Sequence, residues 1–177
     1  MKSIRTIVAL AGIAMTVLSG ASVASASEVP QYCAQQLFEI ESTHPEAAPV
    51  CFPTEREVAQ YLEHLPGSHE VARAANNVVL GVVYKEQNRT GESLTLWGSN
   101  GCVGATFGFP SLASGWGNSI SSATGSNGCW LTLYTKTSYA GSSLNCTPTC
   151  STVGSTWNDK VQSLVFRPNG TFGRSAN

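Results

Sequence analysis

A duplicated pattern of aromatic residues, glycine and short oxygen-bearing side chains constrains the fold of this chain most strongly. In the clearer copy, Tyr134 and Tyr139 are followed by Gly141, and the pattern closes with residues 157–163 (Trp-Asn-Asp-Lys-Val-Gln-Ser). Two rings can pack over a tightly folded hairpin there, while glycine adopts a positive φ that bulkier residues avoid. The closing run supplies amide, carboxylate and hydroxyl oxygens, which a hard cation prefers. We therefore predict a sharply folded hairpin and an oxygen-rich turn.

A weaker copy of the same pattern lies upstream. Tyr84 precedes Gly91 by seven residues, and residues 116–122 (Trp-Gly-Asn-Ser-Ile-Ser-Ser) form its closing run. The tyrosines that begin the two copies are 50 residues apart, whereas the tryptophans that begin the two closing runs are 41 apart. We therefore expect extra residues in the first copy, around Gly104 to Ser114.

Strand patterns surround both copies. Residues 78–84 are apolar and largely β-branched, and residues 93–97 and 130–134 alternate with a period of two. Glycine-rich turns separate them at residues 98–101, 115–117 and 125–128. Short strands with frequent turn signals predict an all-β sandwich over residues 78–177.

This arrangement resembles the βγ-crystallin superfamily, whose Greek-key motifs combine aromatic-x4-aromatic-x-Gly with the run [Asn/Asp]-[Asn/Asp]-x-x-[Ser/Thr]-Ser. The resemblance covers residues 78 to 168. It departs at Arg89, which occupies the place of an aromatic residue, at Gly117 in place of Asn or Asp, and at Gln162 in place of Ser or Thr. The resemblance implies two Greek-key motifs and two calcium sites where the runs cross.

Carried over position by position, the resemblance implies calcium ligands at Asn118, Ser121, Asn158 and Asp159. The side chain of Gln162 is too long to replace a serine hydroxyl, so we expect one of the two sites to be impaired. Ser122 and Ser163 end the runs, and we expect each to bond the backbone of its own turn. The alternative is that all these residues cap turns in a metal-free sandwich.

Asp159 is the only aspartate in the chain. A site with one carboxylate and otherwise neutral donors should bind calcium weakly, with a dissociation constant on the order of 10⁻⁴ to 10⁻³ M. Such binding would stabilise a folded secreted domain rather than sense small signals.

Residues 1–26 are predicted to be a signal peptide. They contain Lys2 and Arg5, an apolar run from residue 7 to 18, and an Ala-Ser-Ala exit at residues 24–26. No later stretch approaches the ~18 apolar residues that a membrane span needs. We expect a freely secreted, monomeric protein that begins near Ser27, with an N-terminal membrane anchor as the alternative.

Six cysteines in an exported chain favour three disulfides. Six cysteines allow fifteen connectivities, among which the sequence does not choose. We predict nearest-neighbour pairing: Cys33 with Cys51, Cys102 with Cys129 and Cys146 with Cys150. Metal thiolates are the alternative at the closely spaced last pair, but the second half of the chain has no histidine to complete a zinc shell.

Residues 27–77 differ from the rest in charge and pattern. They hold eight acidic and two basic residues, whereas residues 78–177 hold three acidic and six basic ones. Opposite net charges would help the two parts to dock. Thr54 and Glu57 match a capping box ahead of a helix that Pro66 and Gly67 would end.

The remainder of this acidic, partly helical segment is less regular. Apolar residues between Tyr32 and Ile40 predict a turn or short helix that reaches Glu41. A unit of this size buries little surface alone, so it should depend on its disulfide and on the β domain. It could be either a permanent part of the protein or a removable pro-segment.

Composition argues against catalysis and nucleic-acid binding. The three histidines, His44, His64 and His69, lie in the acidic segment, so the β domain lacks the base of a hydrolytic triad. Neither part carries the dense basic stripe that nucleic-acid binding requires. We expect a non-catalytic protein whose histidines are ordinary surface residues.

Two other binding functions are alternatives to calcium binding. The resemblance includes small secreted protease inhibitors and antifungal toxin-like proteins, and an inhibitor would present a stiff loop such as Cys146–Cys150. The same loop could equally be a disulfide-tightened turn. The other alternative is carbohydrate or cell-wall binding through the four tryptophans, which could instead serve core packing. They are Trp97, Trp116, Trp130 and Trp157.

Overall fold

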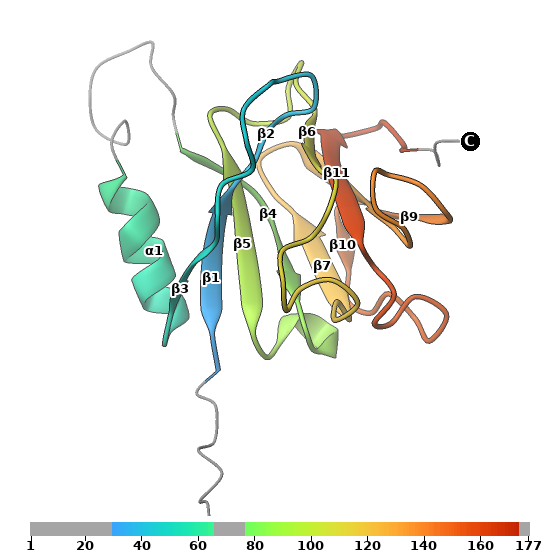
Figure 1. The fold of residues 1–177 in the computed structure, drawn as a ribbon, viewed down its shortest axis with the longest axis horizontal. Helices are drawn as coiled ribbons and strands as arrows, with labels where there is room; N and C mark the ends of the chain where they lie inside the picture. Colours follow the sequence, from blue (N-terminus) through green and yellow to red (C-terminus); the bar gives the residue numbers. More distant parts are fainter. Residues whose placement is uncertain (1–29, 66–76, 174–177) are drawn as a thin grey trace, which may run out of the picture.

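A computed structural model describes residues 30–65 and 77–173, which form two packed β-sheets and one α-helix (Figure 1). The six-stranded sheet has the order β10-β7-β4-β5-β1-β3, and the five-stranded sheet has the order β2-β6-β11-β8-β9. The predicted signal peptide, the Pro66-Gly67 helix stop and His69 lie outside the described residues. The elements are β1 Tyr32–Gln36, β2 Phe38–Glu39, β3 Val50–Phe52, α1 Glu55–His64, β4 Val78–Tyr84, the 3₁₀ turn η1 Gln87–Arg89, β5 Ser93–Gly98, β6 Phe107–Phe109, β7 Ser122–Gly125, β8 Cys129–Tyr134, β9 Ser143–Cys146, β10 Thr149–Cys150 and β11 Ser163–Pro168.

The two sequence copies form two four-stranded motifs that exchange one strand each. The first copy supplies β4 to β7 and the second supplies β8 to β11. The third strand of each copy leaves its own sheet, so that β6 pairs with β11 and β10 pairs with β7. The predicted β-sandwich of two Greek-key motifs is confirmed as a mainly β, two-sheet fold, and each sheet depends on a strand from the other copy.

The difference in length between the copies lies earlier than predicted. Eight residues (99–106) separate β5 from β6, whereas two (147–148) separate β9 from β10. Twelve residues precede the last strand of each copy, at 110–121 and 151–162. The extra residues therefore precede β6 rather than extending over 104–114. The Cys102–Cys129 disulfide ties this longer connection to the start of β8.

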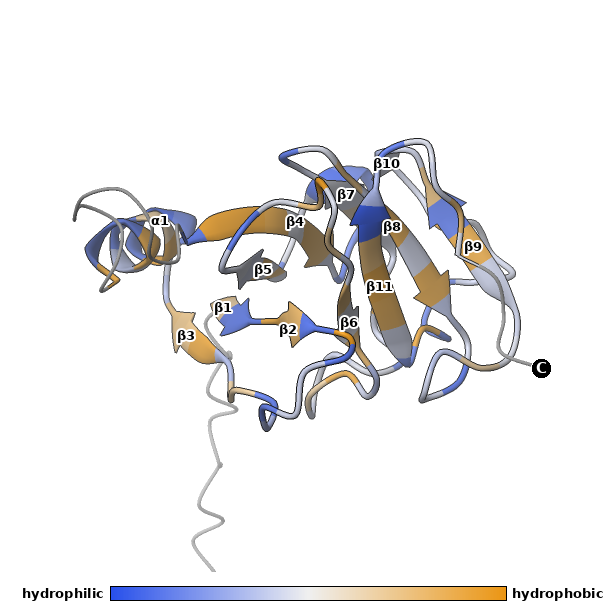
Figure 2. Ribbon diagram, turned by 90° about the horizontal axis from the view of Figure 1, so that it is seen from above, coloured by the Kyte–Doolittle hydropathy of each residue, from blue (hydrophilic) through white to orange (hydrophobic). Residues whose placement is uncertain are grey.

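Inward-facing side chains of both sheets form one apolar core. In Figure 2 apolar residues recur along the strands of both sheets, while α1 is largely hydrophilic. Burying such side chains stabilises the fold by roughly 25 cal/mol for each Å² of apolar surface removed from water. The largest side chains buried there are Phe107, Phe109, Phe166, Leu80, Leu94, Leu96, Ile120, Leu131, Leu133 and Leu164.

Residues 32–39 form strands, so the predicted turn or short helix in this segment was wrong. β1 runs parallel to β5, with five paired residues from Tyr32↔Ser93 to Gln36↔Trp97, and antiparallel to β3. β2 then joins the edge of the other sheet beside β6. A strand that pairs on both edges and is covered on both faces shows little alternation of polar and apolar residues. This explains why its sequence did not resemble a strand.

The helix α1 begins where the capping box predicts. The Thr54 hydroxyl accepts a hydrogen bond from the Glu57 backbone N–H (3.3 Å) and donates to the Glu57 carboxylate (2.8 Å). The apolar face of the helix packs on β1 and β3, where Val58 joins a buried cluster with Ala34 and Trp97. The acidic segment is therefore part of the sandwich through strand pairing and apolar packing. The one salt bridge between described residues, Lys85–Glu92, lies within the β domain.

All three predicted disulfides are confirmed. Cys33 bonds to Cys51, Cys102 to Cys129 and Cys146 to Cys150. The metal-thiolate alternative for the last pair is therefore wrong. Within residues 30–65 and 77–173, no helix has the length and apolar character needed to cross a membrane.

Candidate cation site at the crossing of two turns

Each copy contains a folded hairpin with the same unusual backbone. Two consecutive residues other than glycine adopt left-handed φ angles in each hairpin, and a glycine follows two positions later. They are Asn88 (59°), Arg89 (62°) and Gly91 (76°) in the first copy, and Ser138 (55°), Tyr139 (60°) and Gly141 (78°) in the second. Arg89 therefore replaces the second aromatic residue without changing the backbone. In the second copy the rings of Tyr134 and Tyr139 pack edge to face with centroids 5.9 Å apart.

A buried serine holds each folded hairpin to the start of the last strand of its copy. The Ser122 hydroxyl accepts from the Arg89 backbone N–H (3.0 Å) and donates to the Glu86 carbonyl (2.5 Å). The Ser163 hydroxyl makes the equivalent bonds, accepting from Tyr139 N–H (3.1 Å) and donating to the Lys136 carbonyl (2.6 Å). We predicted bonds to the serines' own turns, which was wrong because the folded hairpin presents an N–H and a carbonyl to the same hydroxyl.

The two closing runs cross and bond each other reciprocally. Asn118 N–H donates to the Val161 carbonyl (2.8 Å), and Asp159 N–H donates to the Ile120 carbonyl (3.4 Å). Both donors have left-handed backbones, with φ of 61° at Asn118 and 57° at Asp159. Asn and Asp tolerate this conformation better than other non-glycine residues. The crossing thus brings together the two segments from which ligands were predicted.

Each run also bonds the base of its own hairpin. Ser121 N–H donates to the Tyr84 carbonyl (2.9 Å), and Gln162 N–H donates to the Tyr134 carbonyl (2.8 Å). The crossing therefore has two equivalent sides. Each side combines the base of one hairpin, the [Ser/Thr] position of the run that follows this hairpin, and the opening residues of the other run. The first side has Ser121 facing the segment of Asn158 and Asp159. The second has Gln162 facing the segment of Gly117 and Asn118.

The side chains fit a cation better on the first side. Asn158 donates its amide N–H to the Asp159 carboxylate (2.7 Å), while its own Oδ1 is buried and has no hydrogen-bond partner among the described residues. A buried oxygen left in this way costs about 1–3 kcal/mol. Ser121 beside it is only 4% exposed. Amide, carboxylate and hydroxyl oxygens suit calcium, so this side has the appropriate donor set.

The second side has fewer suitable donors. Gly117 contributes no side chain, and Gln162 stands where a short hydroxyl is required. Asn118 is exposed to solvent, as Asp159 is, so exposure does not distinguish the two sides. The four predicted ligands therefore lie at one crossing, but three of them belong to the first side and Asn118 to the second.

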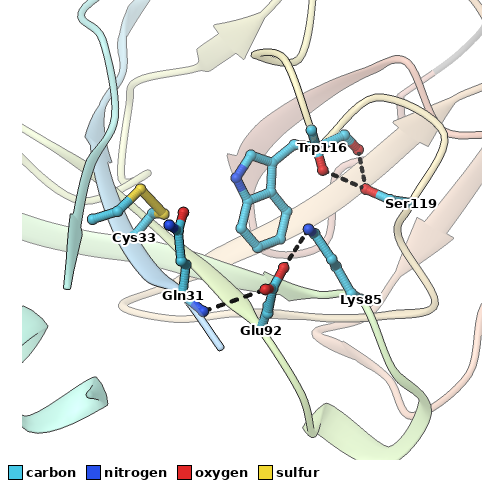
Figure 3. A network of polar contacts seen from close by, with 8 residues as sticks. Gln31, Cys33, Lys85, Glu92, Trp116 and Ser119 are labelled. Atoms are coloured by element: carbon cyan, nitrogen blue, oxygen red, sulfur yellow. Dashed lines mark hydrogen bonds and ion pairs between the residues drawn. A yellow bond between two sulfur atoms is a disulfide. The ribbon is translucent and has the colours of Figure 1, made fainter. Parts of the chain in front are cut away.

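A polar network connects the first hairpin with the N-terminal segment (Figure 3). Lys85 forms a salt bridge with Glu92, whose carboxylate also accepts from Gln31 N–H (3.3 Å). The Lys85 ammonium lies 5.2 Å from the ring centroid of Trp116, at the start of the first closing run. Glu92 thereby neutralises a cation that lies beside this run. Sequence reasoning missed the network because it joins residues far apart in the chain.

The tryptophans do not form a shared platform. Trp97 and Trp116 are buried, at 7% and 4% exposure, whereas Trp130 and Trp157 are partly exposed. The first two serve packing. Of the four tryptophans predicted as an alternative carbohydrate site, only Trp130 and Trp157 are accessible to a ligand.

The Cys146–Cys150 loop is attached to β7 along its length. The Pro148 carbonyl accepts from Gly125 N–H (2.8 Å), and the hydroxyls of Thr149 and Thr124 bond each other (2.9 Å). Residues 147–149 are exposed. Hydrogen bonds therefore hold this turn against β7. A role of the loop in protease inhibition stays a prediction.

The described histidines lie apart from the crossing. His44 stacks on Phe38 with ring centroids 4.9 Å apart, and His64 Nδ1 lies 2.6 Å from the Gln60 carbonyl oxygen. Within the described ranges, no group of three or more His, Cys, Asp or Glu residues could hold a metal ion. The candidate site at the crossing contains only one residue of these four types, Asp159, and its other oxygens come from an amide and a hydroxyl, so it does not belong to this class of metal site.

No protein-family model matches this sequence, and no curated protein matches it either. Solved βγ-crystallin domains from bacteria and archaea do match, over about half of the chain. A domain from Flavobacterium johnsoniae is 27% identical, with a TM-score of 0.37, and the match covers 52% of this chain and 99% of that one. A doubly substituted domain from Clostridium beijerinckii is 20% identical, with a TM-score of 0.41, over 54% and 98% of the two chains. The N-terminal domain of Protein S is 17% identical, with a TM-score of 0.37, over 50% and 96%.

Proposed function

We propose that this chain is a secreted, non-catalytic βγ-crystallin-like protein that binds one calcium ion weakly and is stabilised by it. The observation that carries the proposal is the reciprocal crossing, in which Asn118 bonds Val161 and Asp159 bonds Ile120. The only aspartate of the chain directly follows Asn158, whose buried amide oxygen has no hydrogen-bond partner among the described residues. We assign the ion to the side formed by Ser121, Asn158 and Asp159.

The charge of the site sets the expected affinity. One carboxylate with neutral oxygens should give a dissociation constant on the order of 10⁻³ M. An ion that binds only the folded state stabilises it by RT ln(1 + [L]/Kd), which is about 1.4 kcal/mol at a calcium concentration of about 10 mM. Calcium would therefore be a stabilising component of an extracellular protein.

Secretion and lack of catalysis have separate support. Three disulfides are typical of proteins that fold in an oxidising compartment, in agreement with an export signal at the N-terminus. The β domain contains no histidine and only three acidic residues. Neither observation depends on calcium.

Thermal unfolding of the mature, oxidised chain tests the calcium proposal. The unfolding temperature should rise on addition of about 10 mM calcium and fall again with a chelator. Asp159→Gly should abolish this rise, since it removes the carboxylate while glycine accepts the left-handed backbone. Asn118→Gly is the matched control on the second side and should retain the rise.

Two results would contradict the proposal. If the unaltered protein shows no calcium-dependent rise, the crossing is a metal-free turn. If Asn118→Gly abolishes the rise and Asp159→Gly does not, calcium binds the second side instead.

A further inference from the structure

A partly exposed aromatic surface lies at the other end of β11 from the cation site. Trp130 of β8 is opposite Arg167 of β11 in the strand register. Both alternate with fully buried neighbours, Leu131 and Phe166, so they lie on the outer face of the five-stranded sheet. Phe172 packs on Trp130 with ring centroids 5.3 Å apart and is itself 60% exposed. We call Trp130, Arg167 and Phe172 the aromatic platform.

The segment that carries Phe172 is fixed to the sheet on both sides of it. Thr171 bonds the Pro168 carbonyl through its backbone N–H (3.1 Å) and its hydroxyl (2.6 Å). Gly173 N–H lies 3.2 Å from both the Thr132 hydroxyl and the Asn145 side-chain oxygen. Phe172 is therefore held against Trp130 in an exposed position. A preorganised surface loses little conformational entropy when a ligand binds.

A polar hollow adjoins the platform. It has a volume of about 390 Å³, and Arg167 lines it together with Glu39 and Glu41. The Arg167 Nε is buried and has no hydrogen-bond partner among the described residues. Among the described residues, no carboxylate lies within 4.0 Å of the Arg167 guanidinium, and the one salt bridge joins Lys85 and Glu92 instead. The hollow thus combines planar polar groups of both signs.

We propose that the platform and this hollow bind a neutral polysaccharide chain. A sugar ring presents apolar C–H faces that can pack on Trp130 and Phe172, as other apolar groups do on aromatic rings. Its hydroxyls can donate to Glu39 or Glu41 and accept from Arg167. The two carboxylates would repel an anionic lipid surface or nucleic acid. The carboxylates of Glu39 and Glu41 are also unlike the middle of a protein interface, where Glu is depleted.

The inference is independent of calcium. Ser163, beside the crossing, begins β11, whereas Arg167 lies near its end. Chelation of divalent ions should therefore leave polysaccharide binding unchanged. The carbohydrate site predicted from four tryptophans is replaced by one that uses a single tryptophan, Trp130, and a phenylalanine.

Titration of the mature, oxidised chain with cellohexaose, xylohexaose and chitohexaose tests the inference, with a chelator present. At least one of these neutral hexasaccharides should bind. Phe172→Ala should weaken that binding about tenfold or more, because it removes one ring of the platform. Val50→Ala is the matched control, since Val50 is 40% exposed on β3 of the other sheet. It should bind as the unaltered protein does.

Tryptophan fluorescence locates the ligand. The hexasaccharide should change the emission of the unaltered protein and of Trp157→Phe, but not that of Trp130→Phe. The inference is wrong if none of the three sugars binds at millimolar concentration, or if Phe172→Ala binds as tightly as Val50→Ala. Phe172 lies outside the strands, so this variant should fold even if Trp130→Phe does not.

Discussion

Replacing Ser163 with alanine should lower the free energy of unfolding by about 2–3 kcal/mol. The Ser163 hydroxyl is fully buried and bonds both Tyr139 N–H (3.1 Å) and the Lys136 carbonyl (2.6 Å). Alanine leaves this donor and this acceptor without their partner, and each orphaned group costs about 1–3 kcal/mol where water is excluded. Because the hairpin is partly exposed, water can hydrogen-bond to these groups in the variant and reduce the cost. We therefore expect a loss at the lower end of the sum of the two individual costs.

Urea unfolding of the oxidised protein measures the effect. The midpoint should fall while the slope stays constant, because the surface exposed on unfolding is unchanged. Ser122→Ala is the matched variant, since its hydroxyl makes the equivalent pair of bonds in the first hairpin. The two losses should agree within about 1 kcal/mol. A loss below about 0.5 kcal/mol in both variants would refute the reasoning, because surface substitutions alone have effects of that size.

Two further predictions concern the N-terminal disulfide and one tyrosine. Replacing Cys33 and Cys51 together with serine should lower the free energy of unfolding by about 3 kcal/mol, as expected for a closed loop of this length, and an unchanged urea midpoint would contradict it. Burial, followed by the charge of Glu46, raises the pKa of Tyr139 to about 12. Its neutral form is favoured in the folded state, so the stabilisation is complete below the ordinary pKa of about 10 and is lost as pH rises towards 12. Tyr139→Phe should remove this part of the alkaline destabilisation, and an unaltered stability profile between these pH values would argue against it.

Local patterns in the sequence predicted the parts of the fold that local chemistry determines. The duplicated hairpins appear with left-handed backbones at equivalent positions, because Gly91 and Gly141 mark the same turn. The helix begins at its capping box, and cysteines that are neighbours in sequence are bonded. The turns and the helix start depend on residues close together in the chain, whereas the disulfides join cysteines that are 18, 27 and 4 residues apart.

Long-range pairing could not be inferred in the same way. β6 and β10 have three and two residues, which is too short for any period to appear, and each pairs with the other copy. β1 pairs in parallel with β5, some sixty positions away in the chain. The four residues predicted as cation ligands lie on two runs that backbone hydrogen bonds join, and their role as ligands stays a prediction. The Asn158 oxygen, which has no hydrogen-bond partner among the described residues, and the position of Phe172 depend on packing that no local pattern records.

The parallel pairing of β1 with β5 has a consequence for how the protein can be processed. Without residues 32–52, the backbone of β5 would present a row of free N–H and carbonyl groups to neighbouring molecules, the situation that leads to aggregation of β proteins. The short β3, fastened to β1 by a disulfide, is the outermost strand instead. Proteolytic removal of this segment would expose the β5 edge and favour aggregation. We therefore expect the mature protein to retain residues 32–52, which cover that edge.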